Sequence, residues 1–273
     1  MGSSDDTGSR GIQSAGVSMT VLKVLIESRG PLALRDISAA AGMEPSNVHR
    51  YLASFKDAGM VSQDERSAKY DIGPLAIELG LAALSRLDGI EVGIEVMERL
   101  VRGLKVDGHL CVWGSVGATV IRWRPGGPDV SVRVPEGTVL PLLSSSTGRT
   151  WRAFGHAVDM KRKEAREAER LAARTGTTAA AVLKGLEVQL GEIVASGISW
   201  SSGERRAGID AVCAPVLDRT GQMALSITLL SPSVNFDPHP NGLPAERLKA
   251  AVEEISRRLG CGALELSRYP WRG

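Results

Sequence analysis

The residues best suited to chemistry lie in the first quarter of the sequence, on a segment with one apolar and one polar face. Apolar side chains recur there at the i, i+3, i+4, i+7 spacing of an amphipathic helix that Pro45 can begin. The apolar positions are Val48, Tyr51, Leu52 and Phe55, and the polar face carries Ser46, Asn47, His49, Arg50 and Ser54. In a major groove, arginine can read guanine, asparagine can read adenine, and serine can contact a phosphate or base edge. The pattern predicts a DNA-recognition helix, although a domain of this shape can also mediate protein contacts.

The flanking segments supply the elements needed to position such a helix. Apolar periodicity from residue 19 to Gly30 predicts a first helix, and residues 34–41 predict a short second one that ends at Gly42. After the recognition helix, residues 60–64 and 68–73 alternate as two short strands joined by a polar turn. Three helices and a hairpin predict a winged helix-turn-helix domain over residues 18–73. Basic residues expected to contact phosphates are Arg35, Lys56, Arg66 and Lys69.

Charge limits how such a domain can bind DNA. The 273-residue chain has 33 Lys plus Arg and 31 Asp plus Glu, a net charge of +2. Residues 18–73 hold seven basic and seven acidic residues, so a monomer is expected to bind weakly. A homodimer, or a dimer of dimers, would place two such domains on operator DNA. The apolar helix predicted over 74–88 is interpreted as a linker and dimerisation helix, with a core helix an equally good interpretation.

The rest of the chain predicts a second domain, over residues 89–273. Strand-like runs at 109–115, 118–124, 129–134, 211–218 and 224–231 are mixed with helical segments at 90–104, 159–174, 180–197 and 244–260, and residues 144–155 suggest a further helix start. This mixture predicts an α+β fold around one antiparallel sheet. The Gly/Ser-rich residues 1–17 predict a disordered tail, native or left from cloning. No apolar run is long enough for a membrane span, and three widely spaced cysteines without a secretory leader indicate a cytoplasmic protein.

Catalysis and cofactor binding have little support in the sequence. The four histidines, His49, His109, His156 and His239, are dispersed, and no phosphate loop, nucleophile motif or metal-ligand spacing occurs. We therefore expect no enzyme, no metal and no cofactor. The alternative hypothesis is a metabolite-binding or enzymatic α+β protein whose N-terminal helices only mediate association.

Four segments in order resemble the isocitrate lyase regulator (IclR) family of bacterial transcription factors, over residues 18–260. They are GMEPSNVHRYLASFKDAGMV, YDIGPLAIELG, LPLLSSSTGRTWRAF and SGISWSSGERRAGIDAVCAPVLDRTGQMALSIT. The sequence departs from the family's pattern at residues 45–47, where Lys-Ser-Thr is usual, and at Arg149, where lysine is usual. The resemblance implies a ligand-responsive regulator, a repressor or dual regulator of a catabolic operon. It also implies that the second domain is a GAF-like effector domain that binds a small organic acid.

Hydroxyl-bearing residues mark the expected effector site. Ser144 to Thr147, followed by Gly148, place hydroxyls and free backbone N–H groups at a predicted helix start, which suits a carboxylate, although plain N-capping explains them equally well. By resemblance, the last strand contributes ligand-contacting hydroxyls, here Ser226 and Thr228, which alternation places on one face. The expected effector-binding residues are Ser145, Ser146, Thr147, Gly148, Ser201, Ala211, Cys213, Ser226 and Thr228.

Two departures from the family suggest a different or larger effector. A pocket cysteine common in the family aligns with Ala211, whereas Cys213 lies two residues further on. A pocket aspartate of some members aligns with Ser201. Trp113, Trp123 and Trp200 would suit the wall of a site for an aromatic effector, although tryptophans near sheets are more often core residues.

Overall fold

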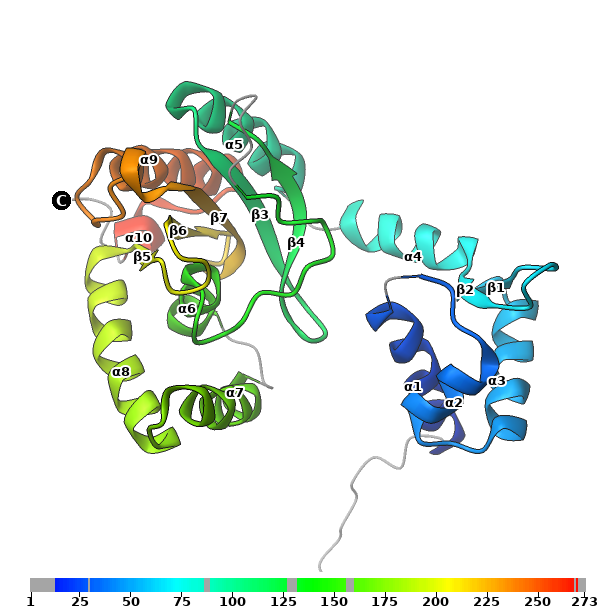
Figure 1. The fold of residues 1–273 in the computed structure, drawn as a ribbon. Helices are drawn as coiled ribbons and strands as arrows, with labels where there is room; N and C mark the ends of the chain where they lie inside the picture. The colour runs from blue at the N-terminus through cyan, green and yellow to red at the C-terminus, as the bar shows by residue number, and fades with distance from the viewer. Residues whose placement is uncertain are drawn as a thin grey trace, which may run out of the picture. The chain divides into compact units, whose positions relative to one another are not determined.

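The computed structural model describes residues 13–28, 30–85, 89–126, 132–155, 160–267 and 269. The chain divides into two compact units, Met1–Arg86 and Leu87–Gly273, which are described separately below (Figure 1). None of the described helices is long and apolar enough to cross a membrane.

Unit 1 contains three helices, a two-stranded wing and a fourth helix. The elements are α1 (Gln13–Glu27), α2 (Leu34–Ala41), α3 (Pro45–Asp57), β1 (Val61–Gln63), β2 (Tyr70–Ile72) and α4 (Pro74–Ser85). The strands β1 and β2 pair antiparallel, with Ser62 opposite Asp71. The predicted helices and hairpin are therefore present. Helix α1 begins within the expected tail, because extending an existing helix requires no new nucleation; residues 1–12 of that tail lie outside the described residues.

The core of unit 1 explains how α3 is held. Val48 and Leu52 are fully buried against Val21, Ile37 and residues of the wing, while Tyr51 and Phe55 are half-buried at its edge. The predicted apolar face of the recognition helix is thus confirmed. On α4, the large apolar side chains of Ile77, Leu79 and Leu81 are more than half exposed in the single chain.

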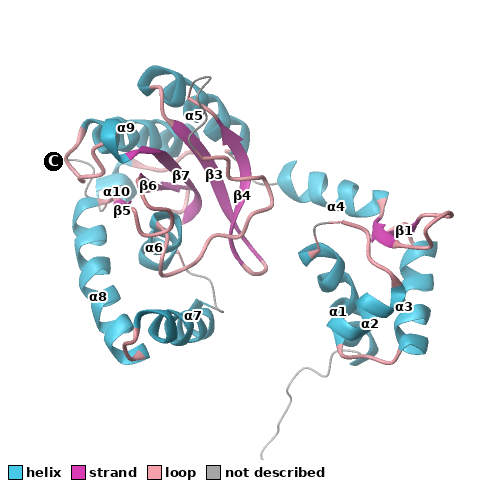
Figure 2. Cartoon of the chain, viewed as in Figure 1, coloured by secondary structure: helices cyan, strands magenta, loops and turns pink. Residues whose placement is uncertain are grey.

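Unit 2 is an α+β structure around one antiparallel five-stranded sheet, as predicted (Figure 2). The strands are β3 (Asp107–Gly114), β4 (Gly117–Arg124), β5 (Ser199–Ser202), β6 (Ile209–Leu217) and β7 (Met223–Pro232), in the order β4-β3-β7-β6-β5. The helices are α5 (Ile90–Leu104), α6 (Ser146–Phe154), α7 (Met160–Thr175), α8 (Ala179–Ser196), α9 (Leu243–Arg258) and α10 (Ala263–Ser267), with a short 3-10 turn at Ser233–Asn235.

The two faces of the sheet have different partners. One face carries Leu110, Val212, Ile227 and Leu229, which form an apolar core with residues of α5 and α9. The opposite face carries the polar side chains and packs against α6, with α7 and α8 beyond it (Figure 1). The alternation predicted for β7 is therefore confirmed, since Leu225, Ile227 and Leu229 face the α5–α9 core and Ser226 and Thr228 face the other way.

One strand was missed by the sequence analysis, and one expected strand is absent from the described residues of its range. Strand β5 follows α8 directly and was not predicted, because its sequence SWSS is short and polar and pairs only with β6. Residues 132–134 of the strand expected at 129–134 form no strand, while residues 129–131 lie outside the described residues. The backbone N–H of Val132 instead donates to the Asp107 carboxylate at 3.3 Å, which ties this segment to the start of β3.

Candidate functional site

The polar face of α3 is exposed. Ser46, Asn47, His49, Arg50 and Ser54 are all solvent-accessible. The Ser54 hydroxyl donates to the carbonyl oxygen of Arg50 within the helix (3.2 Å), whereas Ser46, Asn47 and Arg50 project from its first two turns. Pro45 starts the helix at a position where no backbone donor is needed. The geometry suits entry of the N-terminal turns of α3 into a major groove.

The wing presents two of the expected phosphate contacts. Arg66 and Lys69 are exposed on the β1–β2 turn. The Asp64 carboxylate accepts hydrogen bonds from the Ser67 backbone N–H and hydroxyl, both at 2.7 Å, and these bonds lower the pKa of Asp64. Lys56, at the end of α3, donates to the side-chain oxygen of Gln63 in β1 at 3.3 Å. A cation is thus held between helix and wing.

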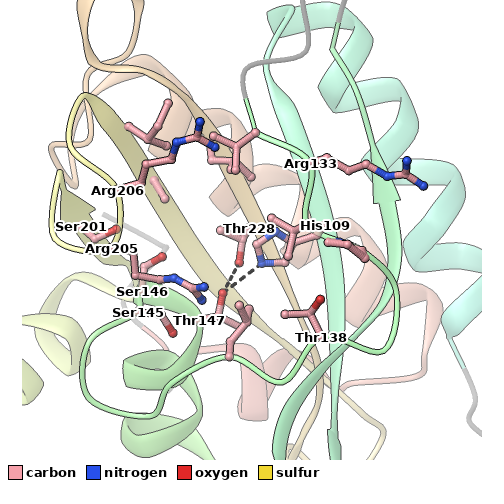
Figure 3. A pocket seen from close by; sticks show the side chains of 17 residues that line it. His109, Arg133, Thr138, Ser145, Ser146, Thr147, Ser201, Arg205, Arg206 and Thr228 are labelled. Atoms are coloured by element: carbon pink, nitrogen blue, oxygen red, sulfur yellow. Dashed lines mark hydrogen bonds between the residues drawn. The ribbon is translucent and has the colours of Figure 1, made fainter. Parts of the chain in front are cut away.

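Unit 2 encloses a cavity of about 340 Å³ on the polar face of the sheet (Figure 3). Six expected effector-binding residues line it: Ser145, Ser146, Thr147, Ser201, Ala211 and Thr228. The other lining residues are His109, Val132, Arg133, Val134, Pro135, Thr138, Leu140, Arg205, Arg206, Ile209 and Leu230. Three arginines and no carboxylate line the cavity, so it favours an anion.

A buried chain of polar groups crosses the floor of this cavity. The Nε2 atom of His109 lies 3.1 Å from the Thr147 hydroxyl, which lies 2.8 Å from the Thr228 hydroxyl (Figure 3). His109 and Thr228 are opposite one another on β3 and β7, which explains why strands far apart in sequence bring them together. Burial, with a smaller effect of the Arg205 charge, lowers the pKa of His109 to about 3, so the ring is neutral at pH 7. Its Nδ1 atom is buried and has no hydrogen-bond partner among the described residues.

The N-terminus of α6 forms another part of the cavity wall. Ser145 is the N-cap: its hydroxyl accepts from the Gly148 N–H at 2.9 Å and donates to the Pro141 carbonyl at 2.6 Å. The capping interpretation of Ser145 is therefore confirmed. The N–H groups of Ser146 and Thr147, in the first turn, have no intrahelical acceptor and are suited to an anion. The Glu167 carboxylate of α7 holds the preceding segment by accepting from the backbone N–H groups of Leu142 (2.7 Å) and Leu143 (3.0 Å).

The arginines that line the cavity belong to two loops. Arg205 and Arg206 lie on the loop between β5 and β6, and Figure 3 shows the Arg205 guanidinium pointing toward Thr147 and His109, whereas Arg133 points away from them. The Arg205 loop is anchored by buried Arg149 of α6, whose guanidinium pairs with Glu204 at 2.7 Å and donates to the carbonyls of Leu143 and Trp200. Arg149 is thus a clamp between the start of α6 and the loop that carries Arg205.

Three expected effector-binding residues lie outside the cavity lining. A Cβ at Gly148 would lie 2.0 Å from the Pro141 carbonyl oxygen, so glycine there permits close packing of α6. The Ser226 hydroxyl instead accepts from the indole N–H of Trp151 at 3.1 Å. Cys213 shares the cavity face with Thr228 but is fully buried under α6, and burial raises the pKa of its thiol.

The expected tryptophan wall is also absent from the cavity lining. Trp113 packs against Trp151, with ring centroids 5.5 Å apart, and Trp200 lies between the two larger cores of unit 2. Trp123 lies opposite His109 on β4 and packs beside Cys111 and Leu140. Sequence reasoning missed His109, Thr138 and the arginines. The run Glu204-Arg205-Arg206 after the strand SWSS was the one local signal for the cations.

The chain combines a winged helix-turn-helix domain with a separate α+β unit whose cavity favours an anion. This combination defines a DNA-binding regulator with a sensor-type domain. Comparison with known families makes this specific. Residues 14–65 match the IclR helix-turn-helix domain, and residues 81–257 match the bacterial transcriptional regulator IclR C-terminal domain. The chain belongs to the IclR family of bacterial transcriptional regulators, which confirms the resemblance.

Several individual proteins are similar over nearly their whole length. HmgR of Pseudomonas aeruginosa, a solved structure, is 34% identical, with 92% of this chain and 100% of that chain covered and a TM-score of 0.55. The transcriptional regulator BhcR of Paracoccus denitrificans is 25% identical, with 94% of this chain and 89% of that protein covered. An IclR homolog from Microbacterium hydrocarbonoxydans, solved with 4-hydroxybenzoate, shares the fold at 19% identity, 90% and 98% coverage and a TM-score of 0.73.

Proposed function

We propose that this regulator responds to a small organic acid bound in the unit 2 cavity. The observation that carries the proposal is the composition of the cavity lining, which has three arginines and no carboxylate. The Arg205 guanidinium and the N–H groups of Ser146 and Thr147 form the carboxylate subsite, where a charged donor and a helix N-terminus act on the same anion.

The remainder of the cavity restricts what the acid carries besides its carboxylate. Val134, Ile209 and Leu230 supply apolar contact for a short or single-ring carbon skeleton, in keeping with a cavity of about 340 Å³. The hydroxyl groups of Thr138 and Ser201, which also line the cavity, can each accept or donate a hydrogen bond and so suit a hydroxyl group on the acid. A carboxylate on a ring with a hydroxyl is also the chemistry of the 4-hydroxybenzoate in the Microbacterium homolog.

DNA binding is assigned to α3 and the wing. Ser46, Asn47, His49 and Arg50 are proposed to contact bases or adjacent phosphates, and Lys56, Arg66 and Lys69 to contact phosphates. The exposed apolar residues Ile77, Leu79 and Leu81 of α4 support assembly into a homodimer or a dimer of dimers. We place this assembly on operator DNA in the cytoplasm. In this proposal the acid shifts the balance between DNA-binding states of the assembly and so controls a catabolic operon.

Thermal denaturation of the full chain with 4-hydroxybenzoate, benzoate and 4-hydroxybenzyl alcohol tests the effector assignment. A ligand that binds only the folded state stabilises it by about 2.7 kcal/mol at a concentration of 100 Kd. We expect the melting temperature to rise by several degrees with an acid and not with the alcohol. The rise should disappear in Arg205→Gln but persist in Lys184→Gln, which removes an exposed charge on α8. Equal shifts in both variants, or a shift with the alcohol alone, would contradict the carboxylate subsite.

A further inference from the structure

Helix α7 separates its charges between two faces. Its acidic residues Glu164 and Glu167 turn inward: Glu164 pairs with Arg152 at 2.5 Å, and Glu167 binds backbone N–H groups ahead of α6. Met160, Ala168 and Ala172 are buried on the same side. Contacts within unit 2 therefore engage two of the three carboxylates of α7. The third, that of Glu169, is exposed.

The outer face of α7 carries a row of arginines. Arg162, Arg166, Arg170 and Arg174 recur every four residues and are all exposed. None of their guanidinium groups forms an ion pair or hydrogen bond with any residue in the described part of the chain. At 1.5 Å per residue the row extends about 18 Å along one side of the helix. We call these four residues the arginine row.

The arginine row weakens the N-terminal part of the helix that carries it, whereas Arg174 lies in the last turn, where the helix dipole favours a cation. Like charges four residues apart repel one another on a helix surface. Arg162 and its neighbour Lys161 also lie in the first turn of α7, where the helix dipole disfavours cations. An external anion that spans the row would relieve both effects. Arginine suits such an anion when it carries phosphate groups, because the guanidinium can donate two parallel hydrogen bonds.

The distribution of charge along the chain indicates which external anion binds the arginine row. Residues 18–73 are neutral overall, with seven basic and seven acidic residues, so the phosphate contacts of unit 1 are opposed by acidic residues of the same domain. Residues 89–273 have 24 basic and 20 acidic residues, and α7 alone contributes six basic and three acidic ones. Three of the four excess positive charges of this half therefore lie on one helix. We propose that the arginine row is a second, sequence-independent contact for the phosphate backbone of duplex DNA.

The salt dependence of DNA binding by the full chain tests this contact. The probe is a random-sequence 40-base-pair duplex, with affinity measured by fluorescence anisotropy between 50 and 300 mM KCl. Each phosphate contact adds about 0.9 to the slope of log affinity against log salt. In the triple variant Arg162→Gln, Arg166→Gln and Arg170→Gln we expect the slope to fall by about 2 to 3. Affinity at 100 mM KCl should fall by about tenfold or more.

A matched control removes three exposed charges elsewhere in unit 2. The variant Lys105→Gln, Lys184→Gln and Arg247→Gln has the same net charge, and its slope should change by less than about 1. An equal loss in both variants would overturn the proposal, because net charge alone would then account for binding. An unchanged slope in the α7 variant would also overturn it. Poly-glutamate is also added to the wild-type protein bound to the duplex, at the same concentration of negative charge as the duplex. Displacement of the duplex would overturn the proposed DNA contact in favour of an acidic protein partner.

Discussion

His109 is the residue on which the polar chemistry of the cavity depends. The residue is 4% exposed, its Nε2 atom lies 3.1 Å from the Thr147 hydroxyl, and its Nδ1 atom is buried without a hydrogen-bond partner among the described residues. A neutral imidazole in this position supplies a directed hydrogen bond without adding to the positive charge of the arginines. His109 therefore supports the linked hydroxyls of Thr147 and Thr228 on the floor of the cavity.

The depressed pKa of His109 makes a prediction about stability in acid. Its value is about 3 in the folded chain against 6.5 in the unfolded one, so the unfolded state binds more protons between these values. The contribution of neutral His109 to the free energy of unfolding is fully present above pH 6.5. It is lost as the pH falls below this value, by about 1.4 kcal/mol per pH unit. From pH 6.5 to pH 5 we expect this residue to remove about 2 kcal/mol of unfolding free energy.

Denaturant titrations of wild type and His109→Gln at pH 7 and pH 5 measure this effect. The free energy of unfolding should fall between pH 7 and pH 5 by about 2 kcal/mol less in the variant than in the wild type. Replacement of the exposed His239 by glutamine should leave the wild-type difference unchanged. An identical acid loss in wild type and His109→Gln would show that His109 is not held neutral.

Arg50 is the residue expected to carry most base discrimination on α3. Its removal in Arg50→Ala should cost about 1 to 3 kcal/mol on a preferred operator and much less on unrelated DNA. In contrast, Lys69→Gln in the wing should weaken binding to both alike and lower the salt slope by about 1. Competition between the preferred operator and unrelated DNA measures the ratio of the two affinities. A ratio preserved in Arg50→Ala would remove this residue from the base-reading set.

At the scale of elements, α6 and its anchors shape the cavity. Glu167 of α7 fixes the segment before α6, and Arg149 of α6 fixes the loop that carries Arg205. Both anchors use side chains that resemble ordinary surface charges in the sequence. Arg149 is nevertheless 2% exposed, so it has a structural role at the position where the family usually has lysine.

Loss of the Arg149 clamp should therefore destabilise unit 2. Arg149→Ala leaves two carbonyl oxygens and the Glu204 carboxylate without their donor, at a cost of about 3 kcal/mol. The exposed Arg206→Ala should cost less than about 0.5 kcal/mol. Urea unfolding followed by circular dichroism compares the two. Equal stabilities for the two variants would contradict the clamp.

Periodicity predicted most elements but only part of the cavity. The faces of α3 and β7 follow from residue types alone, because each buries one side against a local core. His109 and Arg205 are brought together by pairing of strands remote in sequence, which no local pattern encodes. Gly148 and Ser226 lie outside the cavity lining, because a glycine or serine near a site serves packing and hydrogen bonding as well as it serves a ligand.

At the scale of the whole molecule, a net charge of +2 conceals an uneven distribution. The reader in residues 18–73 is neutral, the cavity in unit 2 concentrates arginines, and α7 carries a further row of them. This distribution predicts that DNA affinity depends on a few placed side chains and on assembly. In the proposals made above, the effector's carboxylate and the DNA phosphates bind separate sets of cations.

The central claim is that occupancy of the cavity controls DNA binding, and one measurement tests it directly. The affinity of the full chain for DNA from its own upstream region is measured by anisotropy, with and without a saturating acid chosen by thermal shift. We expect the acid to change this affinity by about 5-fold or more in wild type, the usual range of allosteric coupling, and to leave Arg205→Gln unaffected. An acid that binds the wild type yet leaves its DNA affinity unchanged would contradict the account.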